Sequence, residues 1–478
     1  MISIENISSI FMRCGDESVD VTDLVISIEI YQSLYSPFVT GTITLQDSPS
    51  SRLSKQITGS IVGKGEELLF SIKTKTFAAS RTNELDFEKY YIYKITNIPL
   101  ENTGESMFKQ TILLNFCSKT MFLDSFKPVT GFFYDTISNI VKTISKTYLD
   151  IDLVDIEPTE EKQFVIMPYL HPLQSIQWLT TRAYSFDKTS QKDLLTPQKP
   201  SDIKKKNNNF VFYEDIDHQH HFVSMGLLMS KPSVLGTNED SGIRMETGGT
   251  KGLIDSEDLK YKGSFAGLQH IGKTISPLKN AKIGMYSSTC LTFDITRKKY
   301  GKTNMNYSDL FTNQTHFYNR QLVDPELDSK DVMLNMSYDN PEMVIKYYPK
   351  STYLYTEKEN PLQGNNPSNS VDKWLLPRIA SMEAMDQNGI DVELVGNVGL
   401  SLGDVINFSR PQLDSSPYLP GRDPFFTGKF LITKIKHMLE NKGNFLGFNL
   451  RTSLSLRRDS EYSETLENEA SIGFGGIA

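Results

Sequence analysis

The sequence contains few cysteines and no recognisable arrangement of metal ligands. Its three cysteines, Cys14, Cys117 and Cys290, are far apart and odd in number, and no CxxC or Cys/His ligand spacing is present. We therefore expect buried free thiols rather than a disulfide framework or a zinc site. An HExxH motif is also absent, and we expect no phosphate-binding loop and no serine-nucleophile turn. We predict no catalytic residues and no enzymatic activity.

Long hydrophobic runs and a positive charge balance are missing as well. No stretch approaches the ~20 apolar residues of a membrane span, and the N-terminus lacks the basic and apolar regions of a signal peptide. We therefore expect synthesis in a cytoplasm and no membrane insertion. The formal net charge of −8 argues against a protein that coats nucleic acid with a basic face. An acidic surface would instead let DNA pass without binding it.

The sequence does contain enough apolar residues for several cores, and many short strands. The chain has 478 residues, of which 38% are hydrophobic, a length that suits roughly three domains. Residues 25–30 and 39–45 are rich in β-branched side chains and alternate with period two, as half-buried strands do. The same pattern predicts further strands at 61–72, 90–98, 111–116, 210–214, 221–225, 281–296 and from 391 to about 456.

Two segments have the period of a helix instead. Apolar residues within 132–148 recur on one helical face, and a second helix is expected at 172–184, with proline at its first position. Polar surface loops are expected at 185–209 and at 300–370. The end of the chain, 457–478, is acidic and then glycine-rich, so we expect it to order only against a partner.

One strand–loop–strand unit occurs twice in the sequence. Residues 65–71 (GEELLFS) align with 403–409 (GDVINFS), and residues 100–104 (LENTG) align with 439–443 (LENKG) at nearly the same offset. Any two hairpins in a β-rich chain share glycine turns and alternation, but loops are less constrained by pattern than strands are. We therefore interpret the match as an internal duplication. Its paired positions are Gly65 and Gly403, Phe70 and Phe408, Leu100 and Leu439, and Gly104 and Gly443.

Such a duplication would place two related antiparallel β-barrels in one chain. The predicted fold class is therefore mainly β, with α+β insertions that contain helices and loops. Curling each sheet into a barrel would remove its exposed edges. Three such chains in a ring would present six similar barrels, so the ring could match a sixfold partner with three subunits.

Four stretches carry a resemblance to a known family. They are the strand at 36–47, the helix at 171–183, the hairpin at 210–224 and the run at 428–437. They resemble the central baseplate hub protein of contractile-tailed bacteriophages, of the T-even-like type. The resemblance implies a homotrimer that forms a pseudo-sixfold ring. This ring would adapt the hexameric tail tube protein to the trimeric central spike protein, and its channel would hold the tape-measure protein and let DNA pass.

The resemblance also implies a division into domains, a location and further partners. The implied domains are a first tube-like barrel at 1–117, a helical insertion at 118–208, a discontinuous second barrel at 209–229 plus 372–457, a loop-rich insertion at 230–371 and an extended tail at 458–478. The protein would lie in the tail baseplate of the virion, after assembly in the host cytoplasm, and would contact other baseplate proteins. No cofactor is implied.

Four further residues complete the candidate structural and interface set. Trp178 and Arg182 fall at i and i+4 on the second predicted helix, where packing is the expected role of Trp178. Phe210 and Phe212 belong to the predicted hairpin. The acid and imidazole groups at 215–221 are expected in a polar turn rather than in a metal site.

Two other functions remain open. The first is a spike or injection component of a phage-like or type VI secretion machine, whose barrel part would resemble this chain but which would continue into a long β-helical spike. The second is a cell-wall hydrolase with its active site in the inserted region at 230–371. That activity would need a general-acid carboxylate in an apolar pocket, and the sequence singles out none.

Overall fold

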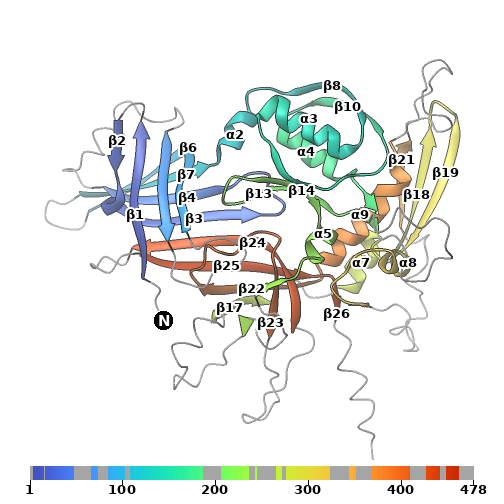
Figure 1. The fold of residues 1–478 in the computed structure, drawn as a ribbon. Coiled ribbons are helices and arrows are strands. Elements are labelled where there is room, and N and C mark those ends of the chain that lie inside the picture. The colour runs from blue at the N-terminus through green and yellow to red at the C-terminus, as the bar shows by residue number, and fades with distance from the viewer. Residues whose placement is uncertain are drawn as a thin grey trace, which may run out of the picture.

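The protein is mainly β-structured, as the sequence predicts. The computed structural model describes residues 4–14, 17–47, 66–73, 84–102, 108–186, 206–235, 243–244, 265–271, 276–322, 344–350, 369–409, 427–441 and 448–461. Figure 1 shows long strands from the two ends of the chain lying together, a helical part above them, and a smaller sheet with helices to one side.

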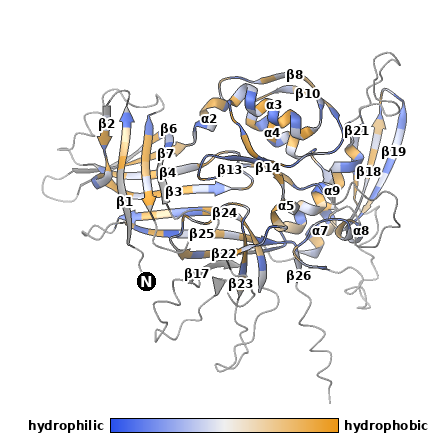
Figure 2. Ribbon diagram, viewed as in Figure 1, coloured by the Kyte–Doolittle hydropathy of each residue, from blue (hydrophilic) through white to orange (hydrophobic). Residues whose placement is uncertain are grey.

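The first strand unit comes from the N-terminal part of the chain. It contains β1 (Ile4–Cys14), β2 (Glu17–Asp20), the short helix η1 (Thr22–Leu24), β3 (Val25–Ser33), β4 (Thr40–Asp47), β5 (Glu67–Lys73), β6 (Glu84–Asn102) and β7 (Phe108–Cys117). Its main strands are antiparallel and follow the order β3-β4-β7-β6-β5-β1. Apolar and polar residues alternate along these strands (Figure 2), so that Ile28 and Ile30 are buried in the first core. The strands predicted at 25–30, 39–45, 90–98 and 111–116 are confirmed.

The second strand unit repeats this order one strand for one strand. It contains β15 (Ser233–Leu235), β16 (Ile243–Arg244), β17 (Phe265–Ile271), β22 (Asn388–Val395), β23 (Val405–Ser409), β24 (Gly428–Asn441) and β25 (Phe448–Arg458). Its order is β17-β22-β25-β24-β23-β15, with β16 also paired to β23. The two units differ at the last partner, because β1 is antiparallel to β5 whereas β15 and β16 are parallel to β23.

The two units share the long hairpin β24–β25. Residues 434–440 of β24 pair with β3, and residues 448–449 of β25 pair with β1. The order β3-β4-β7-β6-β5-β1-β25-β24 therefore returns to β3 and forms a closed circuit of strands. The predicted boundary of the first barrel, 1–117, thus needs correction. The ring closes only with strands from the far end of the sequence, which satisfy both open edges of the first unit.

The helical part follows the first unit. It contains α2 (Lys119–Asp124), β8 (Val129–Asp135), α3 (Ile137–Leu149), β9 (Leu153–Ile156), β10 (Gln163–Leu170), α4 (Pro172–Thr180), β11 (Ser185–Phe186) and β12 (Lys206–Asn207). The helix predicted at 132–148 begins five residues late, because 129–135 pair with β10 as a strand and Thr136 caps the helix through its hydroxyl. The predicted helix at 172–184 ends at Thr180. The greater part of the loop predicted at 185–209 lies outside the described residues.

The region predicted as surface loops contains a packed unit of its own. Its elements are α7 (Pro277–Ile283), β18 (Ser287–Asp294), β19 (Lys299–Asn306), α8 (Tyr307–Thr312), β20 (Arg320–Gln321) and β21 (Ile345–Lys350). The helix α9 (Val371–Met385) completes its core with Trp374 and Leu376. The prediction of loops at 300–370 is therefore wrong for β19, α8 and β21. The strand pair predicted at 281–296 is also wrong, because its first part belongs to α7.

The predicted tail also begins too early. Arg458, Asp459 and Ser460 are buried, and β26 (Ser460–Glu461) pairs with β20. Arg458 has no exposed surface; its guanidinium donates to the carbonyl of Thr427 at 2.8 Å and lies over the ring of Phe430. The residues from 462 onward lie outside the described part of the chain.

Candidate functional site: the hairpin between three cores

A single buried hairpin lies where the cores of the two strand units and the helical part meet. It consists of β13 (Phe210–Glu214) and β14 (His220–Ser224), followed by the short helix α5 (Met225–Met229). Both strands are buried along their whole length. The predicted place of this hairpin in the second barrel needs correction, because β14 pairs in parallel with β9 of the helical part, in a separate three-stranded sheet.

Strand alternation explains how one hairpin serves two cores. Phe210 and Phe212 lie in the core of the helical part, whereas Val211 and Tyr213 lie in the core of the second unit. Because neighbouring side chains of a strand point to opposite faces, β13 joins these cores directly. Burying each aromatic ring stabilises the junction by about 1.5–3 kcal/mol. The structure thus places Phe210 and Phe212 in the core of the helical part.

The end of β13 ties the hairpin to the first unit. Glu214 is almost fully buried and accepts hydrogen bonds from the hydroxyl of Ser118 at 2.6 Å and from the backbone N–H of Val39 at 3.2 Å. Ile216, just past the strand, belongs to the first core. A buried carboxylate needs such donors, since desolvation would otherwise strongly disfavour its charged form. Sequence reasoning did not select Glu214, although an acid that ends an apolar strand could have indicated it.

Imidazole and acid side chains cluster around the turn of this hairpin. His218 lies 2.8 Å from Glu214, while His221 contacts Asp155 at 3.0 Å and Asp215 at 3.2 Å. Among the described residues, no group of histidine, cysteine, aspartate or glutamate side chains is arranged to hold a metal ion. These contacts act as hydrogen bonds that fix the turn.

His220 occupies a separate, buried position on β14. Its Nε2 lies 3.2 Å from the hydroxyl of Thr120 and 3.8 Å from a carboxylate oxygen of Glu214. Burial lowers the pKa of His220 below its ordinary value, an effect larger than the opposing attraction of Glu214. The folded protein therefore favours the neutral imidazole at this position.

The candidate pair Trp178 and Arg182 joins the helical part to the packed unit around α9. The guanidinium of Arg182 lies 3.6 Å from the ring centre of Trp178 and 5.6 Å from that of Trp374. It also donates to the hydroxyl of Tyr348 at 3.3 Å. Arg182 follows the end of α4, so the contact with Trp178 is a stacked cation–π pair rather than a pair along one helix.

A second arginine, Arg378 of α9, strengthens the same junction. It donates to the backbone carbonyls of Thr180, Asn208 and Phe210 at 2.9, 3.2 and 3.0 Å. Burial lowers the pKa of Arg378 to about 10. The side chain satisfies carbonyls at the end of α4 and at the start of the hairpin, so that α9 holds both elements. Neither Arg378 nor Trp374 was selected from the sequence, because α9 contains Pro377 and has no clear apolar face.

The duplicated positions take equivalent places in the two units. Phe70 on β5 stacks on Tyr90 of β6 at 5.2 Å, and Phe408 on β23 packs edge-on against Phe430 of β24 at 6.0 Å. The strand registers also correspond, since Glu67 pairs with Tyr91 in the first unit and Val405 with Leu431 in the second.

The structure describes only some of the remaining residues of the duplication. Gly403 has a φ of +77°, and a Cβ there would meet Leu228 at 2.9 Å, so glycine is required. Leu439 is buried in the first core. Leu100 lies in β6, and Gly65, Gly104 and Gly443 lie outside the described residues.

Two further observations concern the cysteine thiols and the length of the helices. Cys117 and Cys290 are buried free cysteines, as predicted, and burial raises the pKa of Cys117 to about 12. Among the described residues, no helix combines the length and apolarity that a membrane crossing requires.

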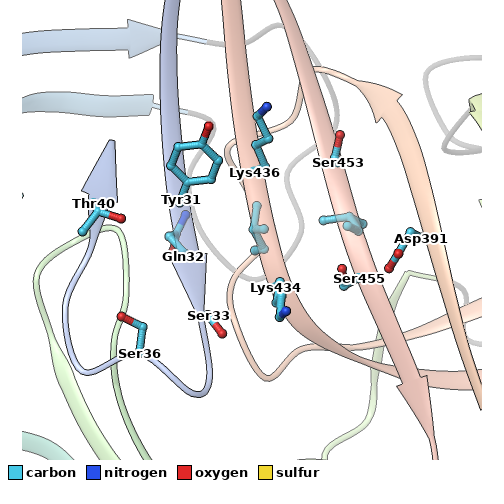
Figure 3. A pocket seen from close by; sticks show the side chains of 12 residues that line it. Tyr31, Gln32, Ser33, Ser36, Thr40, Asp391, Lys434, Lys436, Ser453 and Ser455 are labelled. Carbon is cyan, nitrogen blue, oxygen red and sulfur yellow. The ribbon is translucent and has the colours of Figure 1, made fainter. Parts of the chain in front are cut away.

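A pocket of about 420 Å³ lies along the shared hairpin. Figure 3 shows that Tyr31 and Ser33 come from β3, Lys434 and Lys436 from β24, and Ser453 from β25. Lys436 forms an ion pair with Glu29 at 3.1 Å. The lining offers hydroxyl and ammonium groups for polar contacts.

Two catalytic-type sequence patterns do occur, contrary to the expectation stated above. Residues 267–274 (GLQHIGKT) match the phosphate-loop pattern, and residues 399–403 (GLSLG) match the serine-nucleophile pattern. The first five residues of the former lie within strand β17, antiparallel to β22, whereas a phosphate loop lies between a strand and a helix. The latter leads into strand β23 rather than into a helix, so it lacks the strand–turn–helix of a nucleophile elbow.

Comparison with known proteins gives similarities of fold alone. No protein-family model matches the sequence, and no curated protein matches it significantly. The chain is similar to the tail protein of Neisseria meningitidis, with 8% identity and a TM-score of 0.49, over 94% of this chain and 96% of that one. It is similar to the 43 kDa tail protein of prophage MuSo2 from Shewanella oneidensis, with 8% identity and a TM-score of 0.48, over 95% and 99%.

A third similarity is to a component of the type VI secretion system of E. coli. The identity is 9% and the TM-score 0.37, over 95% of this chain and 77% of that one. At these values none of the similarities assigns a function.

Proposed function

We propose that the protein is a structural baseplate hub subunit of a contractile, phage-like tail. Three copies form a pseudo-sixfold ring that adapts the hexameric tail tube to the trimeric central spike. The tape-measure protein and DNA occupy or pass the channel, and other baseplate proteins surround the ring. The protein acts in the virion tail after assembly in the host cytoplasm.

One observation carries this proposal: the same six-strand order occurs twice in one chain, with matching registers. A partner with sixfold symmetry presents six equivalent surfaces, and three chains with two similar units each can meet all six. With a single unit per chain, a sixfold partner would require six subunits, and a threefold spike would contact equivalent surfaces on alternate subunits only.

The shared hairpin supports an adaptor role in a second way. An adaptor must hold its two units in one fixed relation, because both contact the same rigid partner. In this chain β24 and β25 belong to both units, and Leu439, Phe448 and Leu450 contribute to the first core from the far end of the sequence. A flexible linker between the units would allow relative motion, whereas a shared strand pair restricts it.

The alternative within the same class is a spike or injection component of a phage-like or type VI secretion machine. The fold of the two units suits both roles. The hub is preferred because it uses both units for one symmetric task.

Catalysis is not part of the proposed function. The acids and imidazoles around the central hairpin, among them Glu214 and His221, are engaged in structural hydrogen bonds. The two catalytic-type patterns lead into or lie within strands. A cell-wall hydrolase would show clearing of peptidoglycan in a zymogram, and we expect none.

The test is the mass of the purified full-length chain in solution. At micromolar concentration, multi-angle light scattering is expected to give three times the 54.2 kDa mass of one chain. A monomer at every concentration, or a hexamer, would contradict the hub assignment.

A further inference from the structure

The hairpin β18–β19 presents an apolar and cationic surface at the periphery of the molecule. β19 is the edge strand of the sheet β19-β18-β21, and Figure 1 shows this sheet projecting at one side. Phe293 on β18 lies opposite Tyr300 on β19, and both rings are more than half exposed. Tyr347 on β21 is 75% exposed on the same side of the sheet. Exposed aromatic side chains gathered on one sheet face are typical of a protein contact.

The turn of this hairpin adds positive charge to the apolar face. Arg297, Lys298 and Lys299 are consecutive and exposed, and Ile295 beside them is 72% exposed. Among the described residues none of these three cations forms a salt bridge. A run of three free cations is unusual in a chain whose net charge is −8, so the surface favours an acidic partner.

The same chain carries an acidic strand edge elsewhere. β9 is the edge strand of the sheet β13-β14-β9. Asp150 and Asp152 just before it have side chains that are 89% and 85% exposed, and they share the single cation Lys146. Asp155 is 55% exposed at its side chain, and Val154 between them is also exposed. The edge therefore retains a net negative charge next to an apolar side chain.

We propose that the β18–β19 hairpin of one copy docks on the β9 edge of the next copy in the ring. This inference rests on the proposed trimeric function and names the contact that would close it. The cations of the turn would meet the carboxylates of Asp150 and Asp152, while the aromatic face would cover Val154.

Because the two surfaces differ, the contact is heterologous, and contacts of this kind generate rings when the rotation closes. Pairing of opposite charges sets the register and the association rate of such an interface. It also leaves the face of the cavity along β3, β24 and β25 free for a different partner.

The test uses charge reversal in the full-length chain, followed by mass measurement over a range of concentrations. One variant carries Lys298→Glu and Lys299→Glu, another carries Asp150→Lys and Asp152→Lys, and a third combines all four substitutions. Each reversal alone is expected to raise the dissociation constant of the oligomer at least about tenfold. The combined variant is expected to recover to within about threefold of the wild type, because the charges again attract.

A matched control reverses two exposed lysines elsewhere, Lys94→Glu in β6 and Lys231→Glu between α5 and β15, and should leave the oligomer unchanged. Circular dichroism of each variant confirms that the fold is retained. An oligomeric wild type that both reversals leave unchanged would overturn this contact and leave the proposed function standing. Reversals that are not restored by their combination would also overturn it. A monomeric wild type would instead overturn the proposed function and this contact together.

The same variants also test two other classes of binding partner for the β18–β19 hairpin, anionic membranes and duplex DNA. If Lys298→Glu and Lys299→Glu abolish binding to anionic phospholipid vesicles or to duplex DNA but leave the oligomer intact, the hairpin serves that partner, and the proposed contact is wrong.

Discussion

The two strand units have the same strand order, but their edge strands differ in their pairing partners. The first unit has both of its edge strands, β3 and β1, paired to the shared hairpin, so its circuit of strands is closed. Among the described residues, the outer strands of the second unit, β17 and β15, do not pair with each other. A duplicated strand unit can therefore keep its internal strand pairings while its edge strands pair with different partners. The circuit of the first unit closes only through strands of the second unit. In the part of the chain that the structure describes, the strand order of the second unit includes no strand of the first.

The cores reflect the same asymmetry. The first core includes Leu439, Phe448 and Leu450 from the far end of the sequence. The second core receives Leu34 from the first unit and Val211 from the central hairpin. Neither core is made from one continuous segment, so we expect the two units to unfold in one cooperative transition.

The largest expected effect comes from the equivalent aromatic residues of the two units. Phe70→Ala and Phe408→Ala each remove a fully buried ring and are expected to lower the free energy of unfolding by about 3–5 kcal/mol. Because the units share a hairpin, both variants should shift the same single transition, measured by chemical denaturation followed by circular dichroism and by fluorescence. Two separated transitions in either variant would show that the units are independent.

A smaller effect is expected where the central hairpin meets the first unit. Glu214→Ala leaves the buried hydroxyl of Ser118 and the N–H of Val39 without their acceptor, and should cost about 2–3 kcal/mol. A double-mutant cycle with Ser118→Ala measures the part due to the direct hydrogen bond. Additive losses in the cycle would contradict the contact. The control Gln219→Ala changes an exposed residue in the turn of the same hairpin, and its loss should be under about 0.5 kcal/mol.

The junction around Arg182 lies outside both strand units. A substitution there should leave the packing of the two units unaffected, and so provides a contrast with the changes inside them. Arg182→Ala removes the cation between Trp178 and Trp374 and is expected to cost about 1–2 kcal/mol. These are the two tryptophans of the chain, so intrinsic fluorescence reports this junction directly. The emission should shift to longer wavelength in the folded state. An unchanged spectrum would show that the two rings are not packed on the guanidinium.

The smallest expected effect is a dependence of stability on pH. The unfolded His220 titrates near its ordinary pKa of about 6.5, and its folded pKa is lower because the side chain is buried. The unfolded state thus binds more protons below that pH, so stability falls as the pH drops from about 6.5 toward the folded pKa. His220→Gln should flatten this slope in urea unfolding measured between about pH 5 and 7. A slope equal to that of the wild type would assign the effect to other groups.

Local patterns were sufficient to predict the strands β3 and β4, the hairpin β13–β14, and the duplication itself. Alternation with period two predicts β3 and β4, two apolar runs around a polar turn predict the hairpin, and the repeated loop predicts the duplication. The closure of the first circuit was not predictable, because it depends on strands from opposite ends of the chain. The helix α9 was missed since it contains Pro377 and is buried on several sides, which removes its apolar periodicity.

The candidate site was predicted only in part for the same reason. Phe210, Phe212, Trp178 and Arg182 were selected, but their partners lie on distant segments. Glu214 contacts Ser118, and Arg182 contacts Trp374, so neither role can be derived from spacing along the chain. β14 pairs with β9 rather than with a strand of the second unit. Both partners are distant in the sequence, so spacing along the chain could not distinguish them.

Electron microscopy of the purified chain, with class averages viewed along the symmetry axis, tests the central claim most directly. We expect a ring of three chains around an open channel, with six peripheral densities of similar size that alternate between the first and second strand units. A ring with three densities, or separate particles the size of one chain, would contradict it.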